Sequence, residues 1–207
     1  MGDATVIQPA GNFYDKYRTR NPVARWLMSG FLKAFDNATA VTQGSTRAIE
    51  IGCGEGELSM RLARAGIAVE ACDIAPEAIA EATIRAKAAG LDIPFIECAI
   101  EDVAGRFAPA ELVICCEVLE HLEDPHAALE VLNRLSTRYV LVSVPREPLW
   151  RMLNLVRMRY IAELGNTPGH VKHWSRRRFV QMLATRFDIV SVQSPLPWTM
   201  VLCRVRR

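Results

Sequence analysis

The sequence predicts an α/β fold, a doubly wound parallel sheet with helices on both faces. Three observations indicate it: β-rich runs alternate with helical patterns from about residue 44, a glycine-rich turn follows the first run, and an acidic residue ends the second. The chain has 207 residues and 50% hydrophobic content, enough for one domain with a sizeable core. We therefore expect a single domain over 1–207.

Five strands are predicted from short apolar, β-branched runs at 47–52, 68–73, 93–99, 111–117 and 139–145. Crossover helices between them are expected over 56–66 and 76–90, the second beginning at Pro76 and ending at Gly90. Asp124 and Pro125 provide an N-cap and a first-turn proline for a helix over 126–135. A last helix over 176–187 precedes two runs, 187–193 and 198–205, that are close enough to form an antiparallel hairpin.

Two segments lie outside this alternation. Residues 12–40 are expected to form a helical N-terminal extension, and 146–175 a lid or insertion between the core (45–145) and the final helix and hairpin (176–207). Within the insertion, 148–164 is amphipathic and basic: Leu149, Leu153 and Tyr160 follow helical spacing, flanked by arginines. This pattern is typical of a lid over a pocket or of a helix on an anionic membrane surface.

Charge and cysteine content limit the cellular location and the partners that can be expected for this protein. The N-terminus lacks the features of a signal peptide, no apolar run is long enough to span a bilayer, and the six cysteines show no paired spacing. We therefore expect a cytoplasmic protein with reduced thiols, peripheral to the membrane if 148–164 binds lipid. Residues 143–207 carry 12 Lys and Arg against 3 Asp and Glu. That excess indicates either a solvated basic face or an anionic partner, a membrane or a nucleic acid.

The glycine turn predicts an adenosine-containing cofactor. Gly52, Gly54 and Gly56 follow the first strand directly, and Asp73 ends the second strand, where a carboxylate can accept hydrogen bonds from ribose hydroxyls. Three glutamates surround the turn, Glu50, Glu55 and Glu57. Because this acidity would repel a pyrophosphate, it favours a cationic sulfonium group.

These motifs resemble those of a known enzyme class. IEIGCGEG (49–56), ACD (71–73), IECAIED (96–102) and ICCEVLEHL (114–122) are similar to motifs I to IV of class I S-adenosylmethionine (SAM)-dependent methyltransferases, over roughly 45–145. The resemblance implies a Rossmann-like sheet of seven strands in the order 3-2-1-4-5-7-6. It also implies that the glycines line the methionine part of SAM, Asp73 holds the ribose and Ile74 packs on the adenine. The other candidate cofactor residues are Glu50, Cys53, Glu101, Asp102, Cys116 and Tyr17, with Tyr14 and Arg25 as alternatives to Tyr17.

Catalytic candidates lie in CEVLEH (116–121). If 117–121 forms a helical turn, Glu117, Glu120 and His121 share one face at the carboxyl end of the fourth strand. In one interpretation His121 is a general base and Glu117 assists it. In the other, these three residues bind Mg²⁺, Mn²⁺ or Zn²⁺, with His170 or His173 completing the site.

The E-x-x-E-H pattern resembles two metal-dependent groups. Ubiquinone-biosynthesis O-methyltransferases share EVLEH followed by an acidic-Pro pair and a membrane-contacting insertion; small-RNA 2′-O-methyltransferases have a histidine-rich segment similar to HVKHWSRRRF (170–179). We therefore predict O-methylation of a small phenolic or lipid-like hydroxyl. The alternatives are RNA 2′-O-methylation and a non-catalytic cofactor-binding regulator. The absence of an N/D-P-P-Y/F run after the fourth strand favours oxygen over nitrogen as the acceptor atom.

Overall fold

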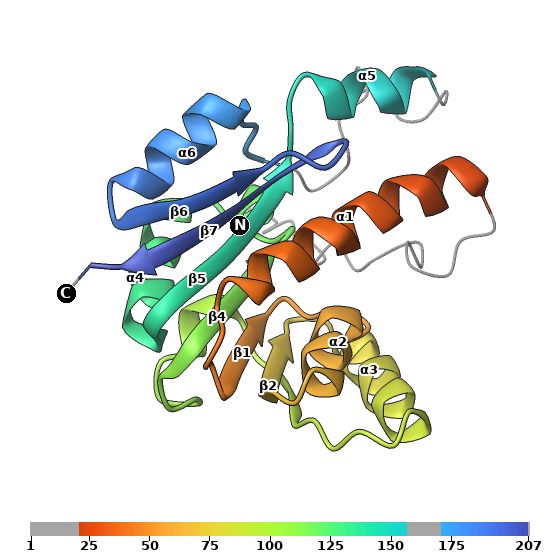
Figure 1. The fold of residues 1–207 in the computed structure, drawn as a ribbon, viewed down its shortest axis with the longest axis vertical. Coiled ribbons are helices and arrows are strands. Elements are labelled where there is room, and N and C mark those ends of the chain that lie inside the picture. The colour runs from red at the N-terminus through yellow and green to blue at the C-terminus, as the bar shows by residue number, and fades with distance from the viewer. Residues whose placement is uncertain (1–20, 157–170, 207) are drawn as a thin grey trace, which may run out of the picture.

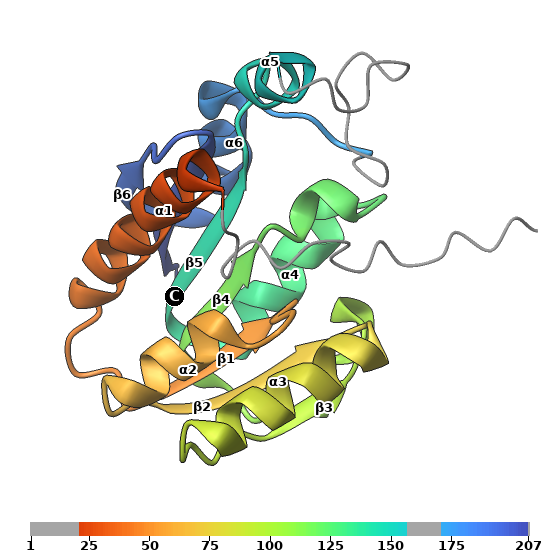
Figure 2. The ribbon, with the colours of Figure 1, turned by 90° about the vertical axis from the view of Figure 1, so that its right-hand side faces the viewer.

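The computed structural model describes residues 21–156 and 171–206, which form one mixed sheet flanked by helices (Figures 1 and 2). The strand order is β3-β2-β1-β4-β5-β7-β6. The strands are β1 (Arg47–Ile51), β2 (Ala68–Asp73), β3 (Phe95–Glu97), β4 (Ala110–Cys116), β5 (Ser136–Pro145), β6 (Phe187–Gln193) and β7 (Trp198–Val205). The α-helices are α1 (Pro22–Ala40), α2 (Glu57–Arg64), α3 (Pro76–Ala88), α4 (Pro125–Leu135), α5 (Leu149–Val156) and α6 (Arg176–Ala184), with short 3-10 turns at Ile100–Asp102 and Leu119–His121.

All strands of the sheet except β7 run in the same direction. β3, β2, β1, β4 and β5 pair in parallel, so their carboxyl ends meet at one edge, the carboxyl edge. β7 runs antiparallel to both β5 and β6. The predicted strand order and the predicted terminal hairpin are therefore confirmed. β3 begins at Phe95, later than the predicted 93, because Pro94 cannot donate to a ladder, and it ends at Glu97, two residues before the predicted end. β5 begins at Ser136, three residues earlier than predicted.

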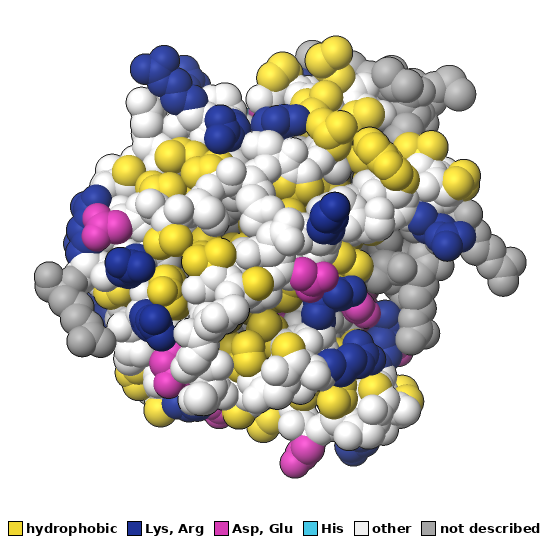
Figure 3. Space-filling model, viewed as in Figure 1, with side chains coloured by type: hydrophobic (Ala, Val, Ile, Leu, Met, Phe, Trp, Pro, Cys, Tyr) yellow, Lys and Arg dark blue, Asp and Glu magenta, His cyan; other side chains and the backbone are white. Residues whose placement is uncertain are grey.

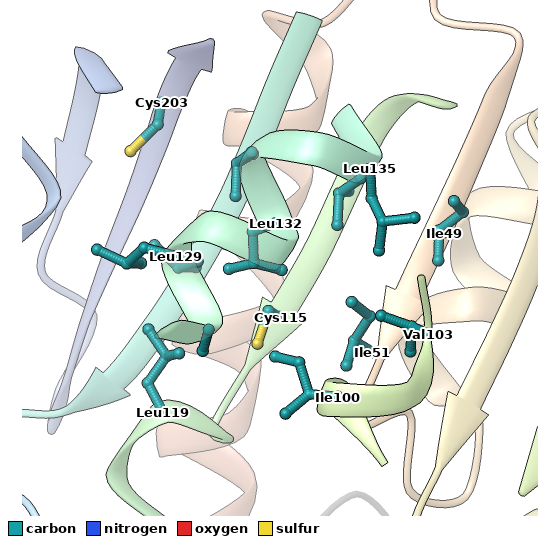
Figure 4. Close-up of a cluster of buried hydrophobic side chains, with 14 of the residues drawn as sticks. Ile49, Ile51, Ile100, Val103, Cys115, Leu119, Leu129, Leu132, Leu135 and Cys203 are labelled. Carbon is teal, nitrogen blue, oxygen red and sulfur yellow. The ribbon is translucent and has the colours of Figure 1, made fainter. Parts of the chain in front are cut away.

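Two apolar layers cover the two faces. On one face α1, α2 and α3 contribute to a cluster that includes Phe31, Phe35 and Leu62; on the other, α4 and α6 contribute to a second cluster. Figure 4 shows Leu129 and Leu132 of α4 and Cys115 of β4 among the side chains of this second cluster. All three side chains are at most 1% exposed. Because both faces are covered, the central strands are apolar on both sides, which explains their continuous hydrophobic runs.

Local signals begin the helices as predicted. The Asp124 carboxylate accepts hydrogen bonds from the N–H groups of His126 and Ala127 at the start of α4. α3 begins at Pro76, and Gly90 follows it with a φ of 70°. At the start of α1, Asn21 accepts from Val23 and Ala24, so the predicted extension is helical from Pro22 onward. The expected division of 1–207 into core, extension and insertion stays a prediction.

α5 covers the first part of the predicted insertion. It begins four residues after β5 ends and lies beyond the carboxyl end of that strand (Figure 2). Over the described ranges, no helix combines the length and the apolar character needed to cross a bilayer.

Candidate active site

The glycine turn joins β1 to α2 through three left-handed residues. Gly52, Gly54 and Gly56 have φ values of 73°, 50° and 78°, which residues other than glycine rarely adopt. The N–H groups of Gly52 and Cys53 both donate to the carbonyl of Cys72 on β2, at 2.8 and 3.0 Å. The turn is thereby fixed against the end of the neighbouring strand, and α2 begins directly after it.

Asp73 fixes the same turn from its side chain. Its Oδ2 accepts a hydrogen bond from the Gly54 N–H at 2.8 Å, and its Oδ1 accepts one from the Ala75 N–H at 2.9 Å. Each carboxylate oxygen keeps a second lone-pair direction, so the group can also accept from a ligand. The carboxylate predicted to hold a ribose therefore lies within hydrogen-bonding distance of the predicted methionine-binding turn.

Buried carboxyl and thiol groups lie next to the glycine turn. Glu50 on β1 is 2% exposed and accepts a hydrogen bond from the Ser59 hydroxyl on α2. Burial raises the pKa of the Cys53 thiol well above its ordinary value, and the nearby carboxylates of Glu50 and Asp73 raise it further. Cys53 is therefore a neutral thiol near pH 7, which fits a lining residue and not a nucleophile.

Four of the remaining cofactor candidates, Ile74, Glu101, Asp102 and Cys116, follow or end strands at the carboxyl edge. Ile74 directly follows Asp73 and is 51% exposed, so its apolar side chain is accessible to a ligand beside the glycine turn. Glu101 and Asp102 are exposed on the 3-10 turn after β3, and Cys116 is buried at the end of β4. Tyr14 and Tyr17 lie outside the described residues, while Arg25 is exposed on α1. The cluster of Asp73, Ile74 and the glycine turn fits an adenosyl group.

Glu117 has a conformation that the sequence did not predict. Among the described residues it alone combines a side chain with a positive φ, 61°, at the exit of β4. Its Oε1 accepts a hydrogen bond from the Ser143 hydroxyl at 2.9 Å, and its Oε2 accepts one from the Trp198 Nε1–H at 2.6 Å. The carboxylate is therefore directed toward β5 and β7.

The predicted shared helical face of Glu117, Glu120 and His121 is wrong. The turn is a 3-10 helix limited to Leu119–His121, and Glu117 lies outside it with left-handed backbone. Glu120 is 1% exposed, and its carbonyl accepts hydrogen bonds from the N–H groups of Val171 and Lys172. His121 is half-buried at the end of the turn.

The described donors do not fit the predicted metal site. No group of three or more His, Cys, Asp and Glu side chains converges within the parts of the chain that the structure describes. Glu117 is engaged with Ser143 and Trp198, and the Nδ1 of His173 lies 3.5 Å from the Glu147 carboxylate. His170 lies outside the described residues.

Ser143 and Trp198 are site residues that the sequence analysis missed. Ser143 is a polar residue inside the apolar strand YVLVSVP (139–145), and that contrast is a usable signal. Trp198 is the first residue of β7 and gives no comparable signal, because a tryptophan in a strand is most simply explained as core.

A groove of about 400 Å³ lies elsewhere, between the end of α1 and the end of α2. Thr39, Ser45, Arg61 and Ile67 are among its lining residues. These positions adjoin the amino ends of β1 and β2, at the opposite end of the sheet from the glycine turn. The groove therefore does not hold the predicted cofactor.

The strand order and the glycine turn together define the class I methyltransferase fold. Comparison with known proteins agrees, because residues 48–137 match the family model described as a methyltransferase domain. The predicted resemblance is thus confirmed: this segment matches a methyltransferase domain, and the chain has the class I methyltransferase fold.

Among named proteins, the chain is similar to ubiquinone biosynthesis O-methyltransferases. A ubiquinone biosynthesis O-methyltransferase of Xylella fastidiosa is 34% identical over 128 residues, 60% of this chain and 52% of that protein. One of Xanthomonas euvesicatoria is 31% identical over 131 residues, 61% of this chain and 55% of the relative. The chain thus spans about half the length of these relatives.

Solved structures share the fold over most of the chain. Magnesium protoporphyrin IX methyltransferase from Synechocystis, with bound SAH, gives a TM-score of 0.71 at 22% identity, covering 92% of this chain and 91% of that one. The N-methyltransferase NodS of Bradyrhizobium japonicum gives 0.65 at 17% identity, covering 87% of this chain and 97% of that one. At these identities the likeness establishes the fold.

Proposed function

We propose that this protein transfers the methyl group of SAM to a hydroxyl oxygen of a small phenolic or lipid-like acceptor. The observation that carries the proposal is the 2.8 Å hydrogen bond from the Gly54 N–H to Asp73, which joins the glycine turn to the strand-end carboxylate beside the exposed Ile74. The ubiquinone biosynthesis O-methyltransferases, matched over about half their length, support oxygen as the acceptor atom.

The described residues can bind each part of SAM. Asp73 can accept from the ribose hydroxyls through its remaining lone pairs, and Ile74 offers an apolar surface for the adenine. The glycine turn lets the backbone approach the methionine part closely. Glu50 and Glu55 are buried near the turn and give it a negative potential, which attracts a sulfonium cation.

SAM supplies a methyl group activated by its bond to a positively charged sulfur. As the acceptor oxygen forms its bond to the methyl carbon, the carbon–sulfur bond breaks and its electron pair stays on sulfur. The hydroxyl proton must leave to a base, and His121, half-buried at the end of the turn after β4, is the candidate. The protein contributes mainly alignment of the oxygen, carbon and sulfur, because this displacement needs no protein nucleophile.

The test combines binding and turnover. Calorimetry with S-adenosylhomocysteine should show tight binding that Asp73→Ala weakens by about tenfold or more. Labelled methyl from SAM should reach phenolic acceptors in a panel, and His121→Gln should slow turnover by roughly 10²-fold while the product cofactor still binds. Binding without transfer to any hydroxyl in the panel would support the non-catalytic alternative. No binding at all would overturn the proposal.

A lipid-like acceptor is favoured by an apolar surface over α5 and the beginning of α1. Trp26 and Val23 of α1 and Met152 of α5 are 63%, 60% and 57% exposed. Figure 3 shows hydrophobic side chains gathered over this part of the molecule. We propose that this surface contacts an anionic membrane. Co-sedimentation with anionic vesicles should fall in Trp26→Ser and Met152→Ser; unchanged binding would contradict the contact. Residues 157–164 of the predicted membrane segment lie outside the described residues.

An RNA 2′-hydroxyl is the second candidate acceptor. Arg176, Arg177 and Arg178 are all exposed at the start of α6, which gives a compact positive surface. RNA binding that weakens steeply with salt, and that Arg177→Gln reduces, would favour this acceptor. Salt-independent turnover of phenols would favour the small molecule.

A further inference from the structure

Trp198 is a buried residue of β7 that contacts Glu117 of the candidate active site. It is 5% exposed at the start of β7, and its register partner is Pro145 at the end of β5. Its Nε1–H donates to the Oε2 of Glu117 at 2.6 Å. Indole nitrogen is a donor only, so this bond has one possible direction, and a carboxylate acceptor makes it strong.

The ring of Trp198 contacts two helices, α1 and α5. Phe31 of α1 meets it edge-on, with ring centroids 5.1 Å apart and planes at 67°. Trp150 of α5 meets it at 5.9 Å and 53°. α1 and α5 come from opposite sides of the core sequence, and Figure 2 shows them bordering the carboxyl end of β5. One side chain therefore touches both helices and a candidate catalytic carboxylate.

The backbone of Glu117 needs this support. A positive φ in a non-glycine residue costs of order 1 kcal/mol or more and persists only where the surroundings impose it. The Glu117 N–H donates to the carbonyl of Ser143 at 3.0 Å, and the Ser143 hydroxyl returns a bond to its carboxylate. With the bond from Trp198, these bonds fix the position of the Glu117 carboxylate.

We propose that Trp198 is a positioning residue. Its hydrogen bond orients the Glu117 carboxylate for the methyl acceptor, and its ring contacts couple that orientation to the packing of α1 and α5. The role in acceptor alignment rests on the proposed methyl transfer. The coupling between Glu117 and the two helices does not, because it follows from the contacts of the protein alone.

The first experiment measures the coupling without turnover. Amide hydrogen exchange is followed in α1 and α5 for the wild type, Trp198→Phe and Glu117→Ala. Trp198→Phe keeps a ring against Phe31 and Trp150 but removes the N–H, so both variants should speed exchange in the two helices by about threefold or more. Tyr139→Phe is the control, since it removes one polar group from a buried aromatic residue at the other end of β5. Exchange equal to that of the control would overturn the coupling.

The second experiment is a double-mutant cycle on turnover. Trp198→Phe should lower kcat/KM for the acceptor by about tenfold, with S-adenosylhomocysteine affinity changed less than about twofold. In a Glu117→Ala background the same change should have no further effect, because Trp198 acts through Glu117. Additive losses would show that Trp198 does not act through Glu117 and overturn its positioning role. If the wild type transfers no methyl group, the proposed function fails, while the exchange experiment still decides the coupling.

Discussion

The Gly54 N–H donates a 2.8 Å hydrogen bond to the Oδ2 of Asp73, across the carboxyl ends of β1 and β2. These two residues are 19 positions apart in the chain: α2 lies between them, and Asp73 is the last residue of β2. Their contact means that the turn expected near the methionine part of SAM and the carboxylate expected near its ribose have one fixed separation before any ligand binds. Pre-organisation of this kind lowers the entropic cost of binding.

Asp73→Asn tests this relationship. The amide keeps the size of the side chain but has a single acceptor oxygen. It therefore cannot accept hydrogen bonds from the Gly54 N–H, the Ala75 N–H and the ribose hydroxyls together. We expect S-adenosylhomocysteine to bind about tenfold to 100-fold more weakly by calorimetry. Asp92→Asn, at an exposed position before β3, should bind like the wild type. Equal affinity of the two variants would show that Asp73 does not hold the ligand.

Gly52→Ala tests the close approach at the turn. A Cβ at this position would lie 2.2 Å from the Cγ2 of Val118, and the φ of 73° is unfavourable for alanine. We expect the free energy of unfolding to fall by about 2–4 kcal/mol, since clash and backbone strain add. Denaturant unfolding would measure it.

Gly66→Ala separates the two causes of that loss. Gly66 has a φ of 85°, and nothing lies within 4 Å of a Cβ built there. It should therefore lose only the strain part, about 1 kcal/mol. Val118→Ala in the Gly52→Ala background should restore part of the difference. Equal losses at Gly52 and Gly66 would contradict a steric role for Val118.

Removal of divalent metal should change little. The donors predicted for a metal do not converge in the described residues: Glu117 is bound to Ser143 and Trp198, and Glu120 is 1% exposed. We expect chelator-treated protein to bind S-adenosylhomocysteine and transfer methyl groups within about twofold of untreated protein. Stoichiometric binding of Mg²⁺, Mn²⁺ or Zn²⁺ that is lost in both Glu120→Ala and His121→Ala would contradict this expectation.

The fold was predictable because its signals are local. Strand runs, Pro76, the Asp124 cap and the glycine turn each act within a few residues, and their order along the chain specifies an alternating α/β sheet. The cofactor edge follows from the same logic, because strand ends of a parallel sheet meet at one edge.

The arrangement after β4 was not predictable in this way. Periodicity places Glu117, Glu120 and His121 on one helical face, but the positive φ of Glu117 turns its carboxylate to Ser143 and Trp198, 26 and 81 residues away. Such partners come from strand pairing between β4, β5 and β7, which sequence spacing does not encode.

The raised pKa values of two buried thiols predict how the free energy of unfolding changes at alkaline pH. Burial raises the pKa of Cys72 and of Cys203 from 9.0 to about 12. Because the unfolded chain releases these protons first, the free energy of unfolding should be unaffected by them below pH 9 and fall as the pH rises from 9 toward 12. Each thiol contributes up to about 1.4 kcal/mol per pH unit in that window.

Cys203→Ala should make this decline shallower, and the matched control is Val201→Ala, another fully buried residue of β7 that has no titrating group. Both substitutions remove core contacts and should lower stability at pH 7 by about 1–3 kcal/mol. Only Cys203→Ala should reduce the slope, because only it removes a proton that the folded state retains. Urea unfolding at several pH values between 8 and 11 measures both slopes. Parallel declines in the two variants would mean that the Cys203 thiol does not contribute to the alkaline loss of stability.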